Sequence, residues 1–314
     1  MNIGIPREIA AKGKEIRAIL LPREVKKIVD AGHRVLVEKD LGARIHAGNP
    51  AYAQSGAVIT KNRQNIFRQD IVVKLKPPLP REFNMLRNNI LFSMLHAEQN
   101  PQYIRMLKKN NCLAIAMELI KNGAGQRLIH CTDMAGEQGM LMAFHLAKKI
   151  PAECSVLTLG YGDISSGALK VAFGLGAKVK ILRRSEYKYI KHFVRNKDII
   201  LNGISWPKEK RDKKHYLITR DMLSLMNKAG LVLDLSVDYP NPIETCRPTL
   251  IDKPAYVVNG ITHLSIFGYP GLAPISSAKK YSQQVLPILL KIASVPVDRF
   301  PPYIKQAVIK PNFL

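Results

Sequence analysis

Short apolar runs alternate with stretches of helical periodicity along this chain, and the alternation stops once and then starts again. Helical patterns over Pro22–Ala31 and Pro101–Lys109 lie between the apolar runs of the first series. Those runs are Asn2–Ile5, Arg34–Val37, Ile71–Leu75, Ile90–Met94 and Leu113–Ala116. Strands that alternate with helices predict an α/β domain whose sheet is largely parallel.

A sustained helical pattern without proline, Thr132–Lys149, separates the first series from a second one. The second series contains expected strands at Ser155–Leu159, Lys178–Leu182, Ile199–Asn202 and Leu231–Leu235, and expected helices at Ser165–Leu175 and Arg220–Asn227. A last long helical pattern, Ser276–Ile292, is placed to return the chain to the first domain. We therefore expect two Rossmann-like, doubly wound α/β domains with a cleft between them, formed by residues 1–132 plus 275–314 and by residues 133–274.

The composition is that of an ordinary globular protein, because 46% of the 314 residues are hydrophobic and 23% are charged. No apolar run approaches the roughly 20 residues that cross a bilayer, and the N-terminal stretch lacks the features of a signal peptide. We expect a cytoplasmic protein without membrane segments. The four cysteines are widely spaced and form no C-x-x-C pattern, so neither a metal site nor a disulfide framework is predicted.

The formal net charge of +24 is the unusual property of the composition. Such a charge favours anionic partners and permits nucleic-acid binding. The basic residues are scattered, however, and no RNA-binding module or interleaved aromatic motif is present. We interpret the charge as the basic surface of an enzyme with anionic ligands, and we expect any nucleic-acid binding to be non-specific.

A glycine turn opens the second series. The stretch Ser155–Lys170, SVLTLGYGDISSGALK, reads as a strand, a tight turn at Gly160 and Gly162, and the start of a helix. Such a turn brings backbone N–H groups and the helix N-terminus close to a pyrophosphate. Ser165 replaces the usual third glycine. A structural βα turn is the alternative, but the strand expected directly after the helix favours a dinucleotide site.

The end of the next strand bears on the choice of cofactor. An NAD site commonly has an acidic residue there for the ribose 2′-hydroxyl, whereas this chain has Arg183 and Arg184. Guanidinium groups favour a 2′-phosphate, so NADPH is predicted over NADH. In the alternative interpretation both arginines are surface residues and Glu186 contacts the ribose. Asn202, at the end of a later strand, is a further candidate to face the cofactor.

Several blocks of the sequence, in the same order, resemble the alanine dehydrogenase and transhydrogenase-like group, which also contains lysine-forming saccharopine dehydrogenases. The blocks are Ile3–Glu8 (IGIPRE), Glu15–Pro22 (EIRAILLP), Ala31–Glu38 (AGHRVLVE), Val73–Pro77 (VKLKP), Ile90–His96 (ILFSMLH) and Leu233–Asp238 (LDLSVD). Within the group, the short length and the glycine turn look most similar to N5-(carboxyethyl)ornithine synthase. The resemblance implies an NADPH-dependent oxidoreductase that acts on CH–NH donors and reductively joins pyruvate, or a similar 2-oxo acid, to an amino-acid amine.

The resemblance also implies roles for individual residues. Arg17 and Lys76 match residues that hold the 2-oxo acid, and Lys76 can also polarise its keto oxygen. His96 matches the acid/base, and its ordinary pKa near neutrality suits that role. Asp238 matches a carboxylate beside the nicotinamide, and Met134 matches a methionine that packs against the substrate. Residues 1–132 plus 275–314 would then form the substrate domain, and residues 133–274 the dinucleotide domain.

Departures from the group keep alternatives open. Glu98 and Glu118 are candidate acceptors for a substrate ammonium. Where alanine dehydrogenases have Met-Ser-Glu and Asn-Met-Pro-Gly, this chain has Met134–Gly136 (MAG) and Asn259–Thr262 (NGIT), and Phe267–Gly271 (FGYPG) has no counterpart. One alternative is an amino-acid dehydrogenase of the alanine dehydrogenase type. Another is a catalytically silent dinucleotide- or nucleic-acid-binding protein on the same scaffold. We expect a homo-oligomer in either case.

Overall fold

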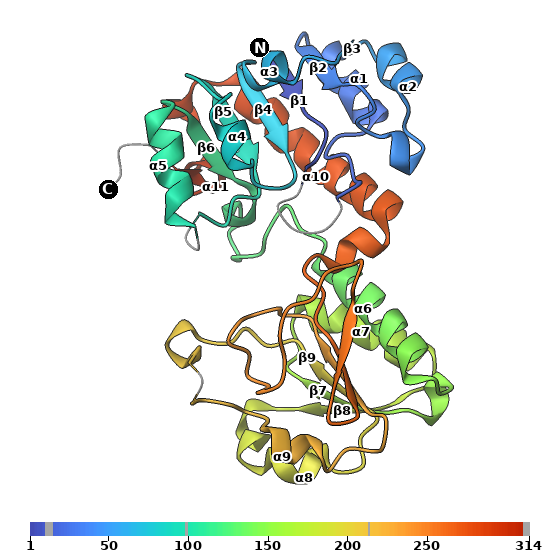
Figure 1. Cartoon of the computed structure of the whole chain (residues 1–314). Coiled ribbons are helices and arrows are strands. Elements are labelled where there is room, and N and C mark those ends of the chain that lie inside the picture. Colours follow the sequence, from blue (N-terminus) through green and yellow to red (C-terminus); the bar gives the residue numbers. More distant parts are fainter. Residues whose placement is uncertain (10–14, 98–99, 213, 310–314) are drawn as a thin grey trace. The chain divides into compact units, whose positions relative to one another are not determined.

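The computed structural model describes residues 1–9, 15–97, 100–212 and 214–309. The chain divides into two compact units, Met1–His130 with Pro274–Leu314 and Cys131–Ala273 (Figure 1). These bounds lie within two residues of the expected ones. Both units are Rossmann-like α/β folds, which confirms the predicted fold class.

The first unit is built on a seven-stranded sheet in the order β13-β6-β5-β4-β1-β2-β3. Every pairing is parallel except that of β13 with β6. The strands are β1 (Asn2–Ile5), β2 (Arg34–Glu38), β3 (Val58–Thr60), β4 (Ile71–Lys74), β5 (Ile90–Ser93), β6 (Leu113–Ala116) and β13 (Val308–Ile309). The strand order reverses between β1 and β4, and ligands of such sheets bind at the carboxyl ends of the strands at this point.

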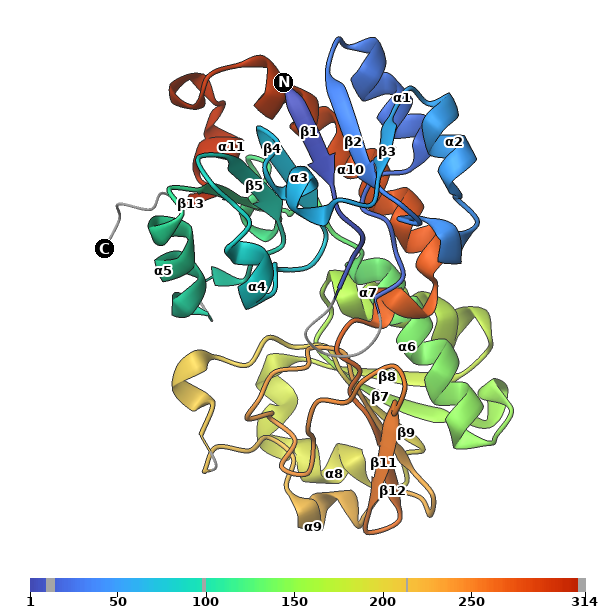
Figure 2. The ribbon, with the colours of Figure 1, turned by 45° about the horizontal axis from the view of Figure 1, so that its top comes forward.

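Helices cover both faces of this sheet, with α3 and α4 on one face and α10 on the other (Figures 1 and 2). Phe67, Phe83 and Leu107 pack on the strands from the side of α3, α4 and α5. On the opposite face, Ser282 of α10 accepts from Leu21 N, directly before α1. The helices are α1 (Pro22–Asp30), α2 (Asn49–Gln54), α3 (Arg63–Phe67), α4 (Pro80–Phe83), α5 (Pro101–Lys109), α10 (Pro274–Ser294) and α11 (Pro302–Lys305).

The second unit has a six-stranded sheet in the order β11-β12-β10-β9-β7-β8, parallel except for the pair of β11 and β12. The strands are β7 (Ser155–Leu159), β8 (Lys178–Leu182), β9 (Ile199–Asn202), β10 (Leu231–Asp234), β11 (Ala255–Val258) and β12 (Ile261–Leu264). The order reverses between β7 and β9. This second switch point lies beside the end of β7, where the glycine turn begins.

Two apolar cores flank the second sheet. One lies under α6 (Thr132–Ala147) and α7 (Asp163–Gly174), and the other under α8 (Ile190–Val194) and α9 (Arg220–Leu223). Where α6 and α7 cross, a Cβ on Gly136 would lie 2.0 Å from the Ile164 carbonyl oxygen, and one on Gly167 would lie 2.0 Å from that of Asp133. Only glycine fits at such an approach of two backbones.

The structure corrects the extent of one helix. We expected a helix over Arg220–Asn227, but α9 ends at Leu223. The following residues bond to the loop before β9 instead, because Leu225 O accepts from Asn196 N and Asn227 N donates to Lys197 O. None of the helices in the described part of the chain is long and apolar enough to span a membrane.

Candidate active site

The carboxyl edge of the first sheet gathers charged side chains at its switch point. Glu8 follows β1, Lys74 and Lys76 lie at the end of β4, His96 follows β5 and Glu118 follows β6. Since β6, β5, β4 and β1 are neighbours in the sheet (Figure 1), these residues from distant parts of the sequence come to one edge.

Arg17 is held by a fork of two hydrogen bonds to Glu15. Its Nε and Nη2 donate to the two carboxylate oxygens at 2.7 and 2.6 Å. The Lys76 ammonium lies 4.0 Å from the same carboxylate, and the Arg17 guanidinium lies 5.6 Å from the centre of the Tyr281 ring on α10. The structure thus brings together the two cations that were predicted to hold a 2-oxo acid, with Glu15 as a counter-charge that was not predicted.

The His96 backbone adopts a left-handed conformation, with φ at 47°. Glu118 is buried, and its carboxylate accepts from His96 N at 2.6 Å and from Leu95 N at 3.1 Å. Both carboxylate oxygens of Glu118 therefore bind the protein backbone. This arrangement argues against the predicted role of Glu118 as an acceptor for a substrate ammonium, and Glu98, the other candidate, lies outside the described residues.

Burial changes the proton affinity of the cations at this edge. The pKa of Lys76 is lowered by burial and by the charge of Arg17, although Glu15 and Glu8 oppose the shift. The pKa of His96 is also lowered by burial, with Arg127 and Lys76 acting in the same direction and Glu118 opposing it. Burial disfavours the ionised form of Glu15, but Arg17 and Lys76 outweigh it and lower the pKa of this carboxyl group. These shifts favour the neutral form of His96, and the neighbouring cations Arg127 and Lys76 contribute to that preference.

A buried ionic network supports the loop that carries Lys76. The Lys74 ammonium is fully buried and lies 2.9 Å from a carboxylate oxygen of Glu8, and 3.8 Å from one of Glu82 on α4. Arg63 bridges Glu82 and Glu38. Buried charges persist only when they are paired in this way. The network therefore fixes the ends of β1, β2 and β4 around the switch point.

The glycine turn of the second unit is open to a ligand. Gly160 has φ at 82°, and a Cβ there would lie 2.5 Å from the side chain of Ile204. At Gly162, the N-cap of α7, a Cβ would meet no atom within 4 Å. The turn thus leaves room in front of the first amides of a twelve-residue helix, which is the geometry that accommodates a diphosphate.

The other predicted cofactor residues differ in exposure. Arg183 and Arg184 are exposed after β8 and form no ion pair within the described part of the chain. Glu186 is fully engaged, since its oxygens accept from Lys180 Nζ and Arg183 N, each at 2.8 Å. Ser165 is completely buried and packs against Gly203 in the loop after β9. Ser165 therefore lets α7 approach this loop rather than presenting its side chain to solvent.

Asn202 and Asp238 are tied into the loops after β9 and β10. The Asn202 amide is buried and donates to Asp234 Oδ1 at 2.9 Å and to Ser236 Oγ at 3.1 Å. The Asp238 carboxylate pairs with Arg211 at 2.9 Å and accepts from Trp206 N at 3.1 Å. Burial raises the pKa of Asp238, and these two donors oppose the shift. The half-buried Met134 lies in the first turn of α6.

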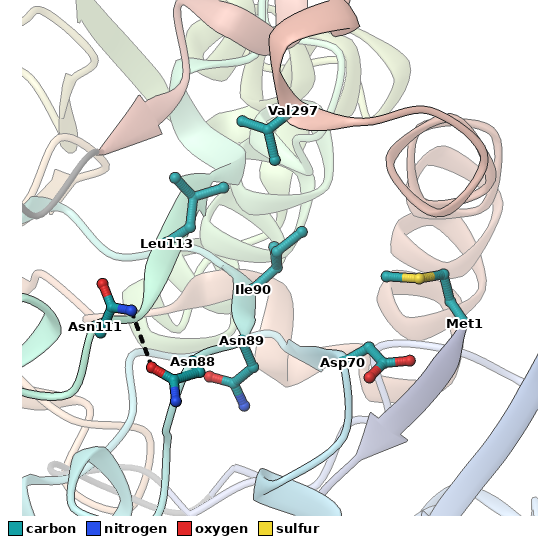
Figure 3. Close-up of a pocket in the computed structure, with 8 residues that line it drawn as sticks. All are labelled: Met1, Asp70, Asn88, Asn89, Ile90, Asn111, Leu113 and Val297. Carbon is teal, nitrogen blue, oxygen red and sulfur yellow. Dashed lines mark hydrogen bonds between the residues drawn. The ribbon is translucent and has the colours of Figure 1, made fainter.

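A hollow of about 480 Å³ lies at the amino edge of the first sheet, opposite the charged cluster (Figure 3). Its walls include Asn88 and Asn111, which are joined by a 2.9 Å hydrogen bond, and the apolar Ile90, Leu113 and Val297. None of the predicted site residues lines it.

All four cysteines are buried and none forms a disulfide. Within the described ranges, no group of three or more His, Cys, Asp or Glu side chains is arranged to hold a metal ion.

Two doubly wound units, one with an open glycine turn and one with a cationic cluster around a histidine, define a dinucleotide-dependent α/β oxidoreductase. Comparisons with known proteins give the family. Residues 4–137 match the N-terminal domain of the alanine dehydrogenase/PNT family, and residues 182–301 match its C-terminal domain. The chain belongs to this family, which confirms the resemblance found in the sequence and the prediction of an NAD(P)-dependent oxidoreductase.

Individual relatives agree with this assignment. The chain is 28% identical to alanine dehydrogenase 1 of Staphylococcus aureus strain Mu50, over 93% of this chain and 87% of the relative. A solved L-alanine dehydrogenase has the same fold, with a TM-score of 0.86 at 24% identity over 98% of this chain and 94% of that one. A transhydrogenase from Sinorhizobium meliloti has a TM-score of 0.82 at 18% identity, over 93% and 94% of the two chains.

Proposed function

We propose that this enzyme joins pyruvate, or a similar 2-oxo acid, to the amine of an amino acid and reduces the product with NADPH, as N5-(carboxyethyl)ornithine synthase does. Alanine dehydrogenases, to which this chain is similar, act on amino-acid CH–NH donors, so the finer assignment concerns the amine. The observation that carries the proposal is the cluster of Arg17, Lys76 and His96 at the carboxyl edge of one sheet, close enough for their charges to interact.

Each residue of this cluster has a separate role in the proposed reaction. Arg17, whose guanidinium fork binds Glu15 in this structure, would exchange that partner for the carboxylate of the 2-oxo acid, and Lys76 polarises the keto oxygen as the amine attacks. His96 donates the proton that leaves with the hydroxyl group as water, and it takes up the proton in the reverse reaction. In the second unit we assign Asp238 to the nicotinamide end of the site and Met134 to packing against the substrate. The bound dinucleotide supplies the hydride.

The second unit offers the features that this cofactor requires. Gly160 and Gly162 leave the amides at the head of α7 accessible to the diphosphate. Ser165 and Asn202 are buried beside this turn and the neighbouring loop, and we assign them to the support of the cofactor site. Because Glu186 is engaged by Lys180 and Arg183, no carboxylate in the described part of this loop is placed for a ribose hydroxyl, whereas Arg183 and Arg184 are exposed for a 2′-phosphate.

A second candidate function is supported by the relatives, which include alanine dehydrogenases at 28% identity. In that case ammonia replaces the amino-acid amine and the product is alanine. The departures at Met134–Gly136 and Asn259–Thr262 argue against L-alanine as the substrate, because they change the two segments that family resemblance associates with the substrate and the nicotinamide.

The experiment follows the loss of reduced nicotinamide absorbance with pyruvate and, in turn, ornithine, lysine and ammonia, with NADPH and with NADH. Turnover with ornithine or lysine and none with ammonia alone supports the condensation. Turnover with ammonia alone would replace it by the alanine dehydrogenase reaction. The product of each active mixture is identified by mass spectrometry.

A further inference from the structure

Two buried glutamates bind the backbone beside Lys76 and beside His96 in the same way. The Glu8 carboxylate accepts from Leu75 N at 2.6 Å and from Lys76 N at 3.2 Å. The Glu118 carboxylate accepts from Leu95 N at 3.1 Å and from His96 N at 2.6 Å. In each case two consecutive amides, ending at the functional residue, bind the two oxygens of one carboxylate.

Each of these glutamates comes from the strand next to the one that it supports. Glu8 follows β1 and binds the end of β4, and Glu118 follows β6 and binds the end of β5. The loops that leave a parallel sheet have no strand partners for their amides, so a carboxylate from the neighbouring strand can set their direction. The two glutamates therefore fix the direction in which the backbone at Lys76 and at His96 leaves the sheet.

The support matters most at His96, whose φ of 47° is a conformation that residues with a Cβ rarely adopt. A residue persists in this conformation only when its surroundings determine it. The two charge-assisted hydrogen bonds of Glu118 lie directly at the strained residue, and they are the contacts that we identify as holding it.

The two glutamates differ in their electrostatic surroundings. The charge of Glu8 is balanced by Lys74, whose ammonium lies 2.9 Å away. Glu118 is only 5% exposed, and no cation among the described residues forms an ion pair with it. Its negative charge therefore acts on His96 through a poorly screened environment.

We propose that Glu118 is the positioning residue for His96, holding its backbone in the left-handed conformation and stabilising the imidazolium form, whereas Glu8 positions Lys76 with its own charge balanced by Lys74. The catalytic part of this inference rests on the proposed function, and the part that concerns protonation does not. The charged groups whose fields reach His96 are Glu118, Arg127 and Lys76. Without Glu118, only the two cations and burial remain, and all three favour the neutral imidazole.

The experiment measures the pKa of His96 in the ligand-free full-length enzyme by NMR of ¹³C-labelled histidine, with the His96 signal assigned from its loss in His96→Gln. Glu118→Gln removes the charge and keeps the side-chain length, and we expect the His96 titration to move to lower pH. The matched control Glu8→Gln removes the other carboxylate, and we expect it to leave the His96 titration near that of the wild type. Glu118→Ala replaces the glutamine variant if the latter is insoluble, since both remove the charge.

Glu118→Asp separates geometry from charge, because the carboxylate remains but is one methylene too short to reach both amides. We expect kcat to fall about tenfold or more in this variant, with KM for NADPH unchanged and the His96 titration near that of the wild type. An unchanged His96 titration in Glu118→Gln, or an equal shift in Glu8→Gln, would overturn the electrostatic role. A wild-type kcat in Glu118→Asp would overturn the positioning role. If wild-type enzyme turns over none of the amines, the proposed function fails, while the titrations still decide the electrostatic role of Glu118.

Discussion

At the scale of single residues, the side chains after β8 make the proposed preference for NADPH testable. Arg183 and Arg184 are exposed there, and a hydrogen bond to a charged partner is worth about 1.5–3 kcal/mol. We expect Arg183→Ala combined with Arg184→Ala to raise KM for NADPH about tenfold or more, and to change KM for NADH far less. Steady-state kinetics with both cofactors measure the ratio.

Lys188 provides the control for this pair. It is an exposed cation on the same short 3-10 helix, Arg184–Tyr189, and its ammonium lies 4.9 Å from the centre of the Tyr189 ring. Lys188→Ala removes a similar charge from the same surface and should leave the preference for NADPH unchanged. If the double variant weakens both cofactors equally, the arginines act through general surface charge and the phosphate assignment is wrong.

The sequence could predict the cations of the site but not the carboxylates that organise them. Arg17, Lys76 and His96 are chemically distinctive and lie in blocks that resemble a known family. Glu8 and Glu15 lie in the same blocks, but a glutamate in a sequence is ordinarily a solvated surface residue. Their burial depends on which strands become neighbours, so only the structure assigns Glu8 to Lys74 and Glu15 to Arg17.

At the scale of secondary-structure elements, the close crossing of α6 and α7 depends on glycine. A methyl group on Gly167 would lie 2.0 Å from the Asp133 carbonyl oxygen, so Gly167→Ala must separate the helices. Overpacking of this kind costs about 1–3 kcal/mol. We expect the urea midpoint of unfolding to fall, and cofactor affinity to fall with it because α7 carries the turn at Gly162.

Gly174 on the same helix is the matched control, because a Cβ there would meet no atom within 4 Å. Gly174→Ala should leave the midpoint unchanged or raise it. Alanine lowers the conformational entropy of the unfolded chain, which stabilises the folded protein by about 0.4–1 kcal/mol. Equal effects of the two substitutions would show that helix packing is not what Gly167 provides.

Elements with a clear hydrophobic pattern were predicted nearly residue by residue, and several short elements without such a pattern were not. The expected bounds of β1, β7, β8 and α5 agree with the structure. The helices α2, α3 and α4 have four to six residues each, which is less than two turns, and β3 has only three residues, so none of them shows a clear periodicity. Their conformations are set by local features that the sequence shows only weakly, such as the Asn62 side chain that accepts from Asn65 N at the start of α3.

At the scale of the whole molecule, both sheets have the same kind of switch point, and most of the proposed site residues of each unit follow strands beside it. The alternation of strands and helices predicts this arrangement, because parallel strands bring their carboxyl ends to one edge. The sequence does not predict the ionic network from Glu38 to Lys74, because its members come from two strands and two helices that are separated in the sequence.

The net charge of +24 also belongs to this scale, because no motif concentrates it. Binding to phosphate backbones through scattered cations releases counterions, so affinity falls steeply with salt and is insensitive to base sequence. With about 6–10 phosphate contacts, we expect affinity for DNA or RNA oligonucleotides to fall by about 10³–10⁵ between roughly 50 and 200 mM salt. Fluorescence anisotropy with several unrelated sequences should give one common slope. An oligonucleotide that stays bound at the higher salt concentration in a sequence-dependent manner would instead indicate a specific nucleic-acid site on this enzyme.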